Sequence, residues 1–513
     1  MICVSIGRTR HKQIIAEHAR LAELGAKLVE LRLDYIGRAV DLKRLLEKRP
    51  TPVVVTCRRK ADGGRWDRTE AERLVLLRSA IVSGADFVDL EEDIAGSIPR
   101  YGKTKRIVSL HDFEKTPADL EEIAQRLAKL DADVVKIATM ANSFADTIRM
   151  LRLIEKAKIP TIGICMGEKG VLTRILGCRY GSPFTFATTS TGRKVAPGQL
   201  TFDQMQNLYR IAEINAKTRL FAVIADPVGH SLSPLVHNAA FQSQGLPYRY
   251  FALQIAPDDL PIFIQWCKQN ESFGGLSVTI PHKETIVKLL NQVESAASSI
   301  GAVNTVIFDR GEALGYNTDY RAAMESIEVA MQTKWGEGST LQGRAVLVLG
   351  AGGVSRAIAQ GLRQRGAIVA IASRSVERSE ALAKDVGGRA LPWDRRYDIK
   401  PGLIVNGTPI GMHPNINETP YEKRYLDERQ IIFDTVYNPE QTLLLKEARE
   451  VGCTVVTGVS MFLRQAAYQY KLFTDSKAPI EVMQKALRKA ISPVNYEIDD
   501  EADDAASDSA DDD

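Results

Sequence analysis

The run DVVKIA at residues 133–138 places a lysine in the middle of a short apolar stretch that is typical of a buried strand. Comparable runs recur through the first 190 residues, separated by helix-like stretches in which apolar residues lie three and four positions apart. The other runs are ICVSI (2–6), KLVELRL (27–33), PVVVTC (52–57), DFVDLE (86–91), RIVSL (106–110), PTIGIC (160–165) and PFTFAT (183–188). Eight strands that alternate with helices predict a (β/α)8 barrel, because eight parallel strands can close on themselves.

The second half of the chain contains the run VLVLGAGGVSRA at 346–357, which reads as a strand, a glycine-rich turn and a helix. Gly350 permits the tight turn, while Gly352 and Gly353 let backbone amides approach a pyrophosphate at the start of the helix. Further strands are expected in GLIVNGT (402–408), QIIFDTVY (430–437) and TVVTGVS (454–460). This pattern predicts a dinucleotide-binding Rossmann lobe. It belongs to a second unit that starts near Leu220, and we expect residues 191–219 to close the barrel unit and to supply the helix that connects the two units.

Composition excludes several classes of protein. The formal net charge is +3, but residues 497–513 contain ten acids and no base, so the rest of the chain is basic. Its lysines and arginines are spread out, which suits small anionic substrates and phosphorylated cofactors rather than nucleic acid. The six cysteines contain no C-x-x-C pair and the seven histidines have no metal-ligand spacing, so we expect reduced thiols and no metal.

The N-terminal sequence MICVSIGRTR enters an apolar strand almost at once, without the pattern of a signal or transit peptide. No run of about 18 apolar residues is present, so no membrane span is predicted. We therefore expect a cytoplasmic protein.

Several ionisable residues lie where the predicted barrel strands end. Catalytic groups of such barrels gather at this face, so side chains from different strands should converge there. Taken singly they have ordinary explanations, such as a structural ion pair for Glu30 with Arg32, a core histidine for His111, and a lysine at position 136 that reaches the rim. The residues are Glu30, Arg32, Arg58, Asp62, His111, Lys136 and Arg174.

Taken together, these segments resemble the type I 3-dehydroquinate dehydratases in order and spacing. The segments are ELRLD (30–34), TCRRKADGG (56–64), SLHDFEKTP (109–117), VVKIAT (134–139), GEKGVLTRILG (167–177) and APGQ (196–199). The resemblance implies dehydration of 3-dehydroquinate to 3-dehydroshikimate through a Schiff base at Lys136, with His111 as general acid and base and Arg174 on the substrate carboxylate. The implied substrate-positioning residues are Glu30, Arg32, Arg58, Asp62 and Gln199. Because only a neutral amine attacks a ketone, burial and nearby cations should lower the pKa of Lys136.

Two positions depart from that family. Asp62 stands where the family usually has the longer glutamate, and Val195 replaces a small hydroxyl residue before APGQ. Both departures put substrate affinity in doubt, while the imine lysine and the proton shuttle are present.

Segments of the second half resemble the shikimate dehydrogenases. They are DPVGHSLSPLVHNAAF (226–241), GLSVTIPHK (275–283), GAVNTV (301–306), GYNTDY (315–320), NGTPIGM (406–412), DTVYNP (434–439) and GVSMFLRQAA (458–467). The resemblance implies a catalytic pair, Lys283 and Asp319, although the residues alone are also compatible with an ordinary ion pair. The implied substrate-binding residues are Ser231, Ser233, Thr279, Asn304, Tyr437 and Gln465.

The strand after the glycine-rich turn ends in Ser373, Arg374 and Ser375, where an NAD site would have an acid. Arg374 can pair with a 2′-phosphate, so the cofactor is expected to be NADP(H). The third position of the glycine motif is Ser355, which is small enough to fit. The expected cofactor-binding residues are Gly350, Ala351, Gly352, Gly353, Val354, Ser373, Arg374, Ser375, Thr408 and Gly458.

The two resemblances imply consecutive steps towards aromatic amino acids, and hence a bifunctional enzyme that acts on 3-dehydroquinate, 3-dehydroshikimate and shikimate. Two alternatives stay open: an NAD(H)-linked quinate/shikimate dehydrogenase of catabolism, and a non-catalytic protein like the fungal repressors of quinate use. We expect a barrel over 1–215, a substrate-binding lobe over 219–320, a Rossmann lobe over 321–492 whose last helices return to the substrate lobe, and a disordered acidic tail over 493–513. The oligomeric state is open.

Overall fold

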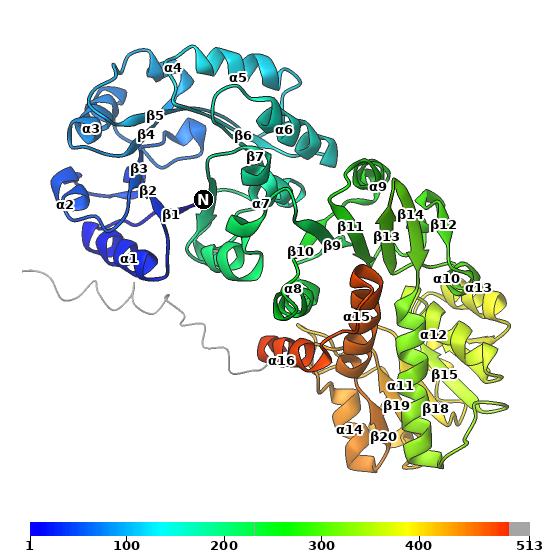
Figure 1. Cartoon of the computed structure of the whole chain (residues 1–513). Coiled ribbons are helices and arrows are strands. Elements are labelled where there is room, and N and C mark those ends of the chain that lie inside the picture. The colour runs from blue at the N-terminus through cyan, green and yellow to red at the C-terminus, as the bar shows by residue number, and fades with distance from the viewer. Residues whose placement is uncertain (230, 492–513) are drawn as a thin grey trace, which may run out of the picture. The chain divides into compact units, whose positions relative to one another are not determined.

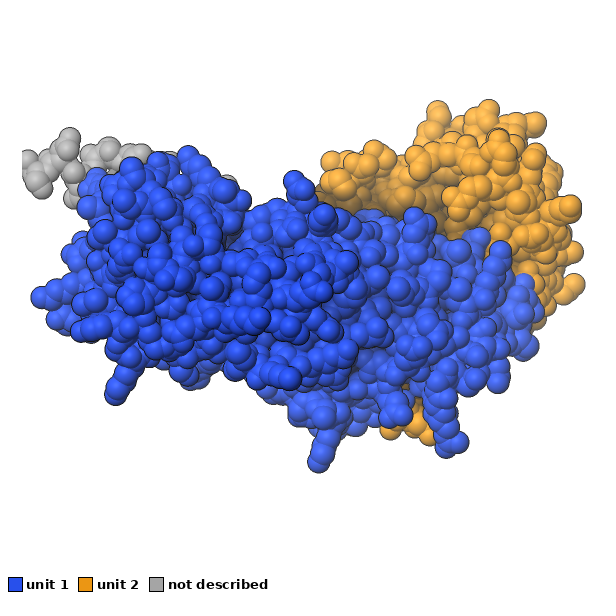
Figure 2. Space-filling view, turned by 90° about the horizontal axis from the view of Figure 1, so that it is seen from above, with its two compact units in different colours: residues 1–234, 244–317 blue, residues 235–243, 318–513 orange. Residues whose placement is uncertain are grey.

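The computed structural model describes residues 1–229 and 231–491 (Figure 1). The chain divides into two compact units, coloured separately in Figure 2. The first comprises Met1–Pro234 and Gln244–Asn317, and the second comprises Leu235–Ser243 and Thr318–Asp513. The expected acidic tail lies outside the described residues. The four-part division proposed from the sequence stays a prediction.

The first unit begins with the parallel eight-stranded sheet of a (β/α)8 barrel (Figure 1). The strand order is β7-β6-β5-β4-β3-β2-β1-β8, so the ring is nearly closed. The strands are β1 (Ile2–Ile6), β2 (Leu28–Arg32), β3 (Val53–Thr56), β4 (Phe87–Glu91), β5 (Lys105–Asp112), β6 (Val134–Met140), β7 (Thr161–Met166) and β8 (Thr185–Thr188). Almost every residue of these strands is buried, as expected for a parallel sheet that is covered on its outside by helices and filled inside by side chains.

Helices follow the strands around the barrel. They are α1 (His11–Glu23), α2 (Leu42–Leu46), α3 (Glu70–Val82), α4 (Glu92–Ala95), α5 (Leu120–Ala128), α6 (Phe144–Lys156) and α7 (Val171–Tyr180). Local sequence fixes where they begin: Thr69 and Glu72 form a reciprocal capping box at the start of α3. The predicted connecting helix within 191–219 is wrong. That segment contains short helical turns at Thr191–Arg193, Gln204–Leu208 and Ile211–Glu213, because Pro197 and the left-handed Gly198 and Arg210 interrupt a regular helix.

The remainder of the first unit is an α/β lobe, residues 219–234 and 244–317, which we call the substrate lobe. Its mixed sheet has the order β10-β9-β11-β13-β14-β12. The strands are β9 (Arg219–Ala225), β10 (Tyr248–Gln254), β11 (Phe273–Val278), β12 (Gln292–Val293), β13 (Thr305–Asp309) and β14 (Glu312–Tyr316). Helices α9 (Leu260–Gln269) and α10 (Ser295–Ile300) belong to it, and α8 (Ser233–Ser243) follows the segment 226–232.

The second unit contains a parallel sheet with the order β17-β16-β15-β18-β19-β20. In chain order this is 3-2-1-4-5-6, the topology of a Rossmann fold. The strands are β15 (Ala345–Leu349), β16 (Ile368–Ala372), β17 (Arg389–Leu391), β18 (Leu403–Asn406), β19 (Ile431–Asp434) and β20 (Thr454–Val456). The helices are α11 (Thr318–Trp335), α12 (Gly353–Gln364), α13 (Val376–Val386), α14 (Leu443–Val451), α15 (Gly458–Thr474) and α16 (Ile480–Ile491). Among the described residues, no helix has the length and apolar character that crossing a bilayer requires.

Candidate active sites

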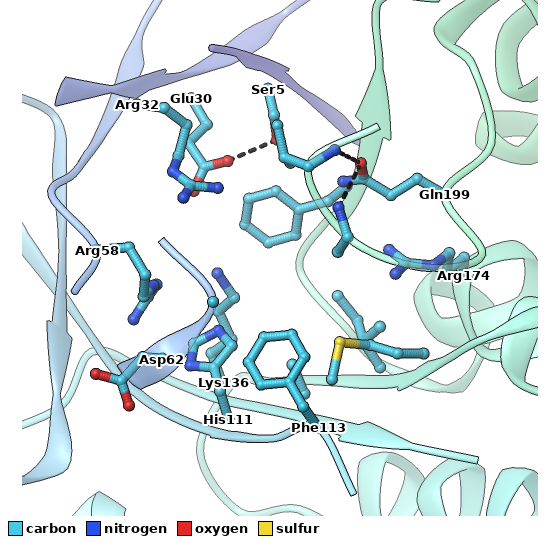
Figure 3. Close-up of a pocket in the computed structure, with 17 residues that line it drawn as sticks. Ser5, Glu30, Arg32, Arg58, Asp62, His111, Phe113, Lys136, Arg174 and Gln199 are labelled. Carbon is cyan, nitrogen blue, oxygen red and sulfur yellow. Dashed lines mark hydrogen bonds between the residues drawn. The ribbon is translucent and has the colours of Figure 1, made fainter. Parts of the chain in front are cut away.

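The barrel contains an open cavity that is lined by side chains of its strands and connections (Figure 3). All the barrel residues predicted to be functional line it: Glu30, Arg32, Arg58, Asp62, His111, Lys136, Arg174 and Gln199. The departure Val195 also lines it. The cavity therefore gathers side chains from six parts of the chain that are far apart in sequence.

Lys136 lies on β6, and its ammonium is held by a buried carboxylate. Its Nζ donates to Asp89 Oδ2 at 2.8 Å, and Arg58 Nη2 lies 2.8 Å from the same oxygen. Ser109 donates to the other oxygen, Oδ1, at 2.6 Å. Although burial opposes ionisation of Asp89, the charges of Arg58 and Lys136 hold the pKa of that carboxyl well below its usual range. Lys136 thus pairs with the buried carboxylate of Asp89, a residue that the sequence interpretation did not include.

Asp89 and Glu91 are the functional candidates that sequence reasoning missed. Both side chains are buried, and Glu91 accepts hydrogen bonds from Arg58 at 2.9 Å and from Arg73 at 2.8 Å. The available signal was the run FVDLE (87–91), in which acids occupy alternate positions of an otherwise buried strand. Alternate residues of a strand share a face, so both acids had to point the same way.

His111 lies two residues beyond Ser109 on β5, on the face that borders the cavity. Burial, and then the positive charges of Arg58 and Lys136, hold the pKa of the imidazole well below its ordinary value of 6.5. Its Nδ1 is buried and makes no hydrogen bond to the described residues. The ring stacks on Phe113 with a centroid separation of 6.4 Å. A neutral imidazole with a free nitrogen is suited to accept a proton.

The carboxylate of Asp62 is turned away from His111 (Figure 3). It accepts a hydrogen bond from Arg59 Nε at 2.7 Å instead. The type I 3-dehydroquinate dehydratases usually have the longer glutamate at this position. The shorter Asp62 instead forms an ion pair with Arg59.

Arg174 is almost completely buried on α7, yet its guanidinium forms no ion pair with a carboxylate of the described residues. Its Nη2 donates to the carbonyl of Pro197 at 3.2 Å, and Nε makes no hydrogen bond there. Burial lowers its pKa to about 10. An unpaired buried cation that borders a cavity is suited to bind an anionic ligand.

Glu30 and Arg32 do not form the ion pair that the sequence left open. Glu30 accepts hydrogen bonds from Ser5 at 2.6 Å and Thr56 at 2.8 Å, while Arg32 pairs with Asp34 at 2.8 Å. Across the cavity, Gln199 Oε1 accepts from the backbone N–H of Val195 at 2.8 Å. Among residues 1–229 and 231–491, no group of three or more His, Cys, Asp or Glu side chains is arranged to hold a metal ion.

The substrate lobe carries five of the residues predicted for the second activity: Ser231, Ser233, Thr279, Lys283 and Asn304. Its β9 and β11 are parallel neighbours, so Thr279 and Lys283 follow β11 at the edge where the 226–232 segment follows β9. Two backbone hydrogen bonds stabilise this edge. The N–H of Asn304 donates to the Tyr316 carbonyl, and the N–H of Val303 donates to the Lys283 carbonyl. Tyr250 was not predicted; its buried hydroxyl donates to Ser277 Oγ at 2.5 Å, beneath the same edge.

The glycine-rich turn of the second unit has the geometry predicted for it. Gly350 adopts a φ of +99° and its N–H donates to Ala372, and α12 begins at Gly353. A side chain on Gly352 would meet nothing within 4 Å, so the space beside the turn is open. The side chain of Ser355 has room in the turn because the residue that faces it is Gly407. A Cβ on Gly407 would come within 2.2 Å of Ser355 Oγ. The residues present therefore fit a pyrophosphate at the start of α12.

Beyond β16, Ser373 Oγ donates to the Ser375 carbonyl at 2.5 Å, and Arg374 is exposed. A second arginine, Arg378, was not predicted and donates to the carbonyl of Ala351 in the glycine-rich turn at 3.4 Å. The backbone N–H and the side-chain hydroxyl of Thr408 both donate to Oδ1 of Asn406, the last residue of β18. Gly458 begins α15 against the Val436 carbonyl, which a Cβ would approach to 2.2 Å.

The other predicted residues of the second activity, Asp319, Tyr437 and Gln465, belong to the second unit. Asp319 lies at the start of α11, and Gln465 lies on α15. The pairing of Asp319 with Lys283 of the first unit stays a prediction.

Comparison with protein-family models assigns both halves. Residues 2–216 match the model for type I 3-dehydroquinase. Residues 223–306 match the shikimate dehydrogenase substrate binding domain, and 332–399 match shikimate/quinate 5-dehydrogenase. Residues 458–488 match the shikimate 5′-dehydrogenase C-terminal domain.

Known relatives agree with these matches. The chloroplastic bifunctional 3-dehydroquinate dehydratase/shikimate dehydrogenase of Arabidopsis thaliana is 38% identical over 95% of this chain and 84% of its own length. The shikimate dehydrogenase (NADP(+)) of Methanocaldococcus jannaschii is 38% identical over 53% of this chain and 98% of its own. A crystal structure of a shikimate dehydrogenase in complex with NADP+ covers 54% of this chain and 98% of its own, with a TM-score of 0.50 and 38% identity.

Proposed function

This chain belongs to the family of bifunctional 3-dehydroquinate dehydratase/shikimate dehydrogenases, and we propose that each half performs its step with the residues described above. The barrel converts 3-dehydroquinate to 3-dehydroshikimate. The second half reduces 3-dehydroshikimate to shikimate with NADPH. The NAD(H)-linked catabolic enzyme and the non-catalytic sensor are not favoured, since the relative matched over most of the chain is named as a bifunctional enzyme and the shikimate dehydrogenase of Methanocaldococcus jannaschii is named as NADP(+)-dependent.

In the barrel, the Nζ of Lys136 attacks the substrate ketone and forms an imine, with loss of water. Neutral His111 removes the proton beside the imine carbon, whose electrons the protonated imine accepts. His111 then returns that proton to the departing hydroxyl, and water hydrolyses the imine to release product and Lys136. Arg174 holds the substrate carboxylate throughout. Asp89 and Arg58 keep Lys136 oriented towards the cavity.

In the second half, the residues around Gly350–Gly353 would hold the pyrophosphate of NADP(H), and Arg374 would pair with its 2′-phosphate. When bound there, NADPH would supply the hydride for reduction of the carbonyl carbon. Lys283 donates a proton to the oxygen, and Asp319 keeps the ammonium in place. Ser231 and Ser233 bind the substrate carboxylate, Thr279, Asn304 and Gln465 bind ring hydroxyls, and Tyr437 lies near the carboxylate.

The observation that carries the dehydratase proposal is a buried lysine and a neutral histidine in one cavity with an unpaired arginine. The test is to incubate the full chain with 3-dehydroquinate and borohydride, which reduces an imine to a stable amine. Mass spectrometry of the peptides should find the substrate-derived mass on Lys136. An unmodified Lys136 peptide after complete turnover would remove the imine mechanism.

A further inference from the structure

Asp259 of the substrate lobe makes two contacts to the barrel, one of them buried. It precedes α9, and its Oδ1 accepts a hydrogen bond from the backbone N–H of Phe144, the first residue of α6, at 3.0 Å. Its Oδ2 lies 3.2 Å from Nζ of Lys169, which belongs to the connection between β7 and α7. Asp259 is buried, as is its hydrogen bond to Phe144, while the side chain of Lys169 is 33% exposed. One acid of the dehydrogenase half therefore caps a barrel helix and holds a barrel loop.

Aromatic packing beside Asp259 makes this junction rigid. Phe144 packs edge-to-face on Phe263 and Trp266 of α9, with ring centroids 4.9 and 5.5 Å apart. All three rings belong to one continuous hydrophobic core that extends from the barrel into the substrate lobe. The position of Asp259 relative to α6 is thus fixed by packing as well as by hydrogen bonding.

Lys169 transmits the position of Asp259 to the dehydratase cavity. Its Nζ also donates to the carbonyl of Asn142 at 2.9 Å, and its carbonyl accepts from Thr147 of α6 at 3.0 Å. Two residues earlier, the N–H of Gly167 donates to Pro197 at 3.3 Å. Gly198 packs so closely on Gly167 that a Cβ there would come within 2.4 Å of the Gly167 carbonyl. The β7–α7 connection and the segment before Gln199 are therefore packed together as one body.

That body carries the substrate-binding side of the cavity. Arg174 donates to Pro197, and Gln199 accepts from Val195 and Ala196. Figure 3 shows Arg174 and Gln199 next to each other on one side of the cavity, apart from Arg58 and His111. Lys136 and His111 lie within strands β6 and β5 and not on the β7–α7 connection.

We propose that Asp259 is a positioning residue of the dehydratase: through Lys169 it places the Arg174 and Gln199 wall against the substrate carboxylate. The inference rests on the proposed function of the barrel. Because it concerns the wall and not the lysine or the proton shuttle, loosening the junction should raise the KM for 3-dehydroquinate and change kcat little.

The test compares the full chain with Asp259→Asn, which keeps the acceptor for Phe144 but removes the charge opposite Lys169, and with Lys169→Met. Asp258→Asn, an exposed acid one residue earlier, is the matched control. Each single variant at the junction should raise the dehydratase KM roughly tenfold. The double variant should cost no more than either single one, because both remove the same pair. Shikimate oxidation in the same samples should keep its KM and kcat.

A dehydratase KM for Asp259→Asn within twofold of the wild type would overturn the proposal, and so would equal losses of both activities. Hydrogen exchange gives a readout that does not depend on the reaction. The amides of 167–170 and 196–199 should exchange faster in Asp259→Asn than in Asp258→Asn, and unchanged protection would overturn the proposal. If the wild type itself converts no 3-dehydroquinate, the proposed function fails, and the exchange measurement still decides the role of the junction.

Discussion

The two activities are built in different ways. Every residue assigned to the dehydratase comes from one nearly closed sheet and its connections, within the first unit. The residues assigned to the dehydrogenase are divided, with Lys283 in the first unit and Asp319 in the second. A barrel fixes its side chains through eight strands at once, whereas a divided set depends on two separately folded bodies. The chain therefore offers two sites whose losses can be measured independently in one sample.

Replacing Lys136 should give the largest and most selective effect. Lys136→Arg keeps a cation beside Asp89 but has no nucleophilic amine, so dehydratase kcat should fall by at least about 10⁴-fold. Shikimate oxidation by the same preparation should stay within twofold, which serves as the folding control. Residual dehydratase activity above about a hundredth of the wild type would mean that Lys136 acts only through its charge.

Replacing Lys283 should affect the dehydrogenase alone. Lys283→Met removes the proton donor to the substrate oxygen, so dehydrogenase kcat should fall about 10³-fold while the dehydratase is unaffected. Asp319→Asn should cost less, and the double variant should be no worse than Lys283→Met alone if the two side chains act as a pair. Additive losses, measured by steady-state kinetics, would contradict the pairing.

Arg174→Lys tests whether the guanidinium grips a carboxylate. The lysine keeps the positive charge but cannot donate two parallel hydrogen bonds, so the KM for 3-dehydroquinate should rise roughly thirtyfold with a smaller change in kcat. Shikimate oxidation is again the internal control. A KM equal to that of the wild type would show that the substrate carboxylate binds elsewhere in the cavity.

Arg374→Ala should weaken the preference for the phosphorylated cofactor. The KM for NADPH should rise about tenfold and that for NADH should hardly change, because only NADPH carries the 2′-phosphate. Arg389→Ala, an exposed arginine at the start of β17, is the matched control. Equal losses with both cofactors would assign Arg374 a structural role.

The pH dependence of the dehydratase should show the smallest effect. Burial and the cations Arg58 and Lys136 disfavour the imidazolium and lower the pKa of His111, so the neutral base persists as pH falls. The dehydratase kcat/KM should therefore stay level through pH 6.5 and decline only below it. If half of the dehydratase kcat/KM is already lost when the pH has fallen to 6.5, while shikimate oxidation is intact, His111 is not held neutral.

Much of this fold could be predicted from apolar runs. The eight runs expected for the barrel coincide with β1–β8, because strands of a covered parallel sheet are apolar on both faces. Positions that follow a strand, such as Arg58, could also be assigned to one face. The hydrogen-bond and ion-pair partners of these residues could not be predicted, because they depend on side-chain rotamers and on strands that are far apart in sequence. The pairing of Lys136 with Asp89, 47 residues apart, needed the closed barrel to become visible.

The purified protein alone, supplied with 3-dehydroquinate and NADPH, shows whether both sites work in one chain. If both sites work in one chain, NADPH should be consumed one for one with the appearance of shikimate, and Lys136→Arg should abolish this with 3-dehydroquinate but not with 3-dehydroshikimate. No loss of NADPH from the wild type with 3-dehydroquinate, while 3-dehydroshikimate is reduced, would contradict the account.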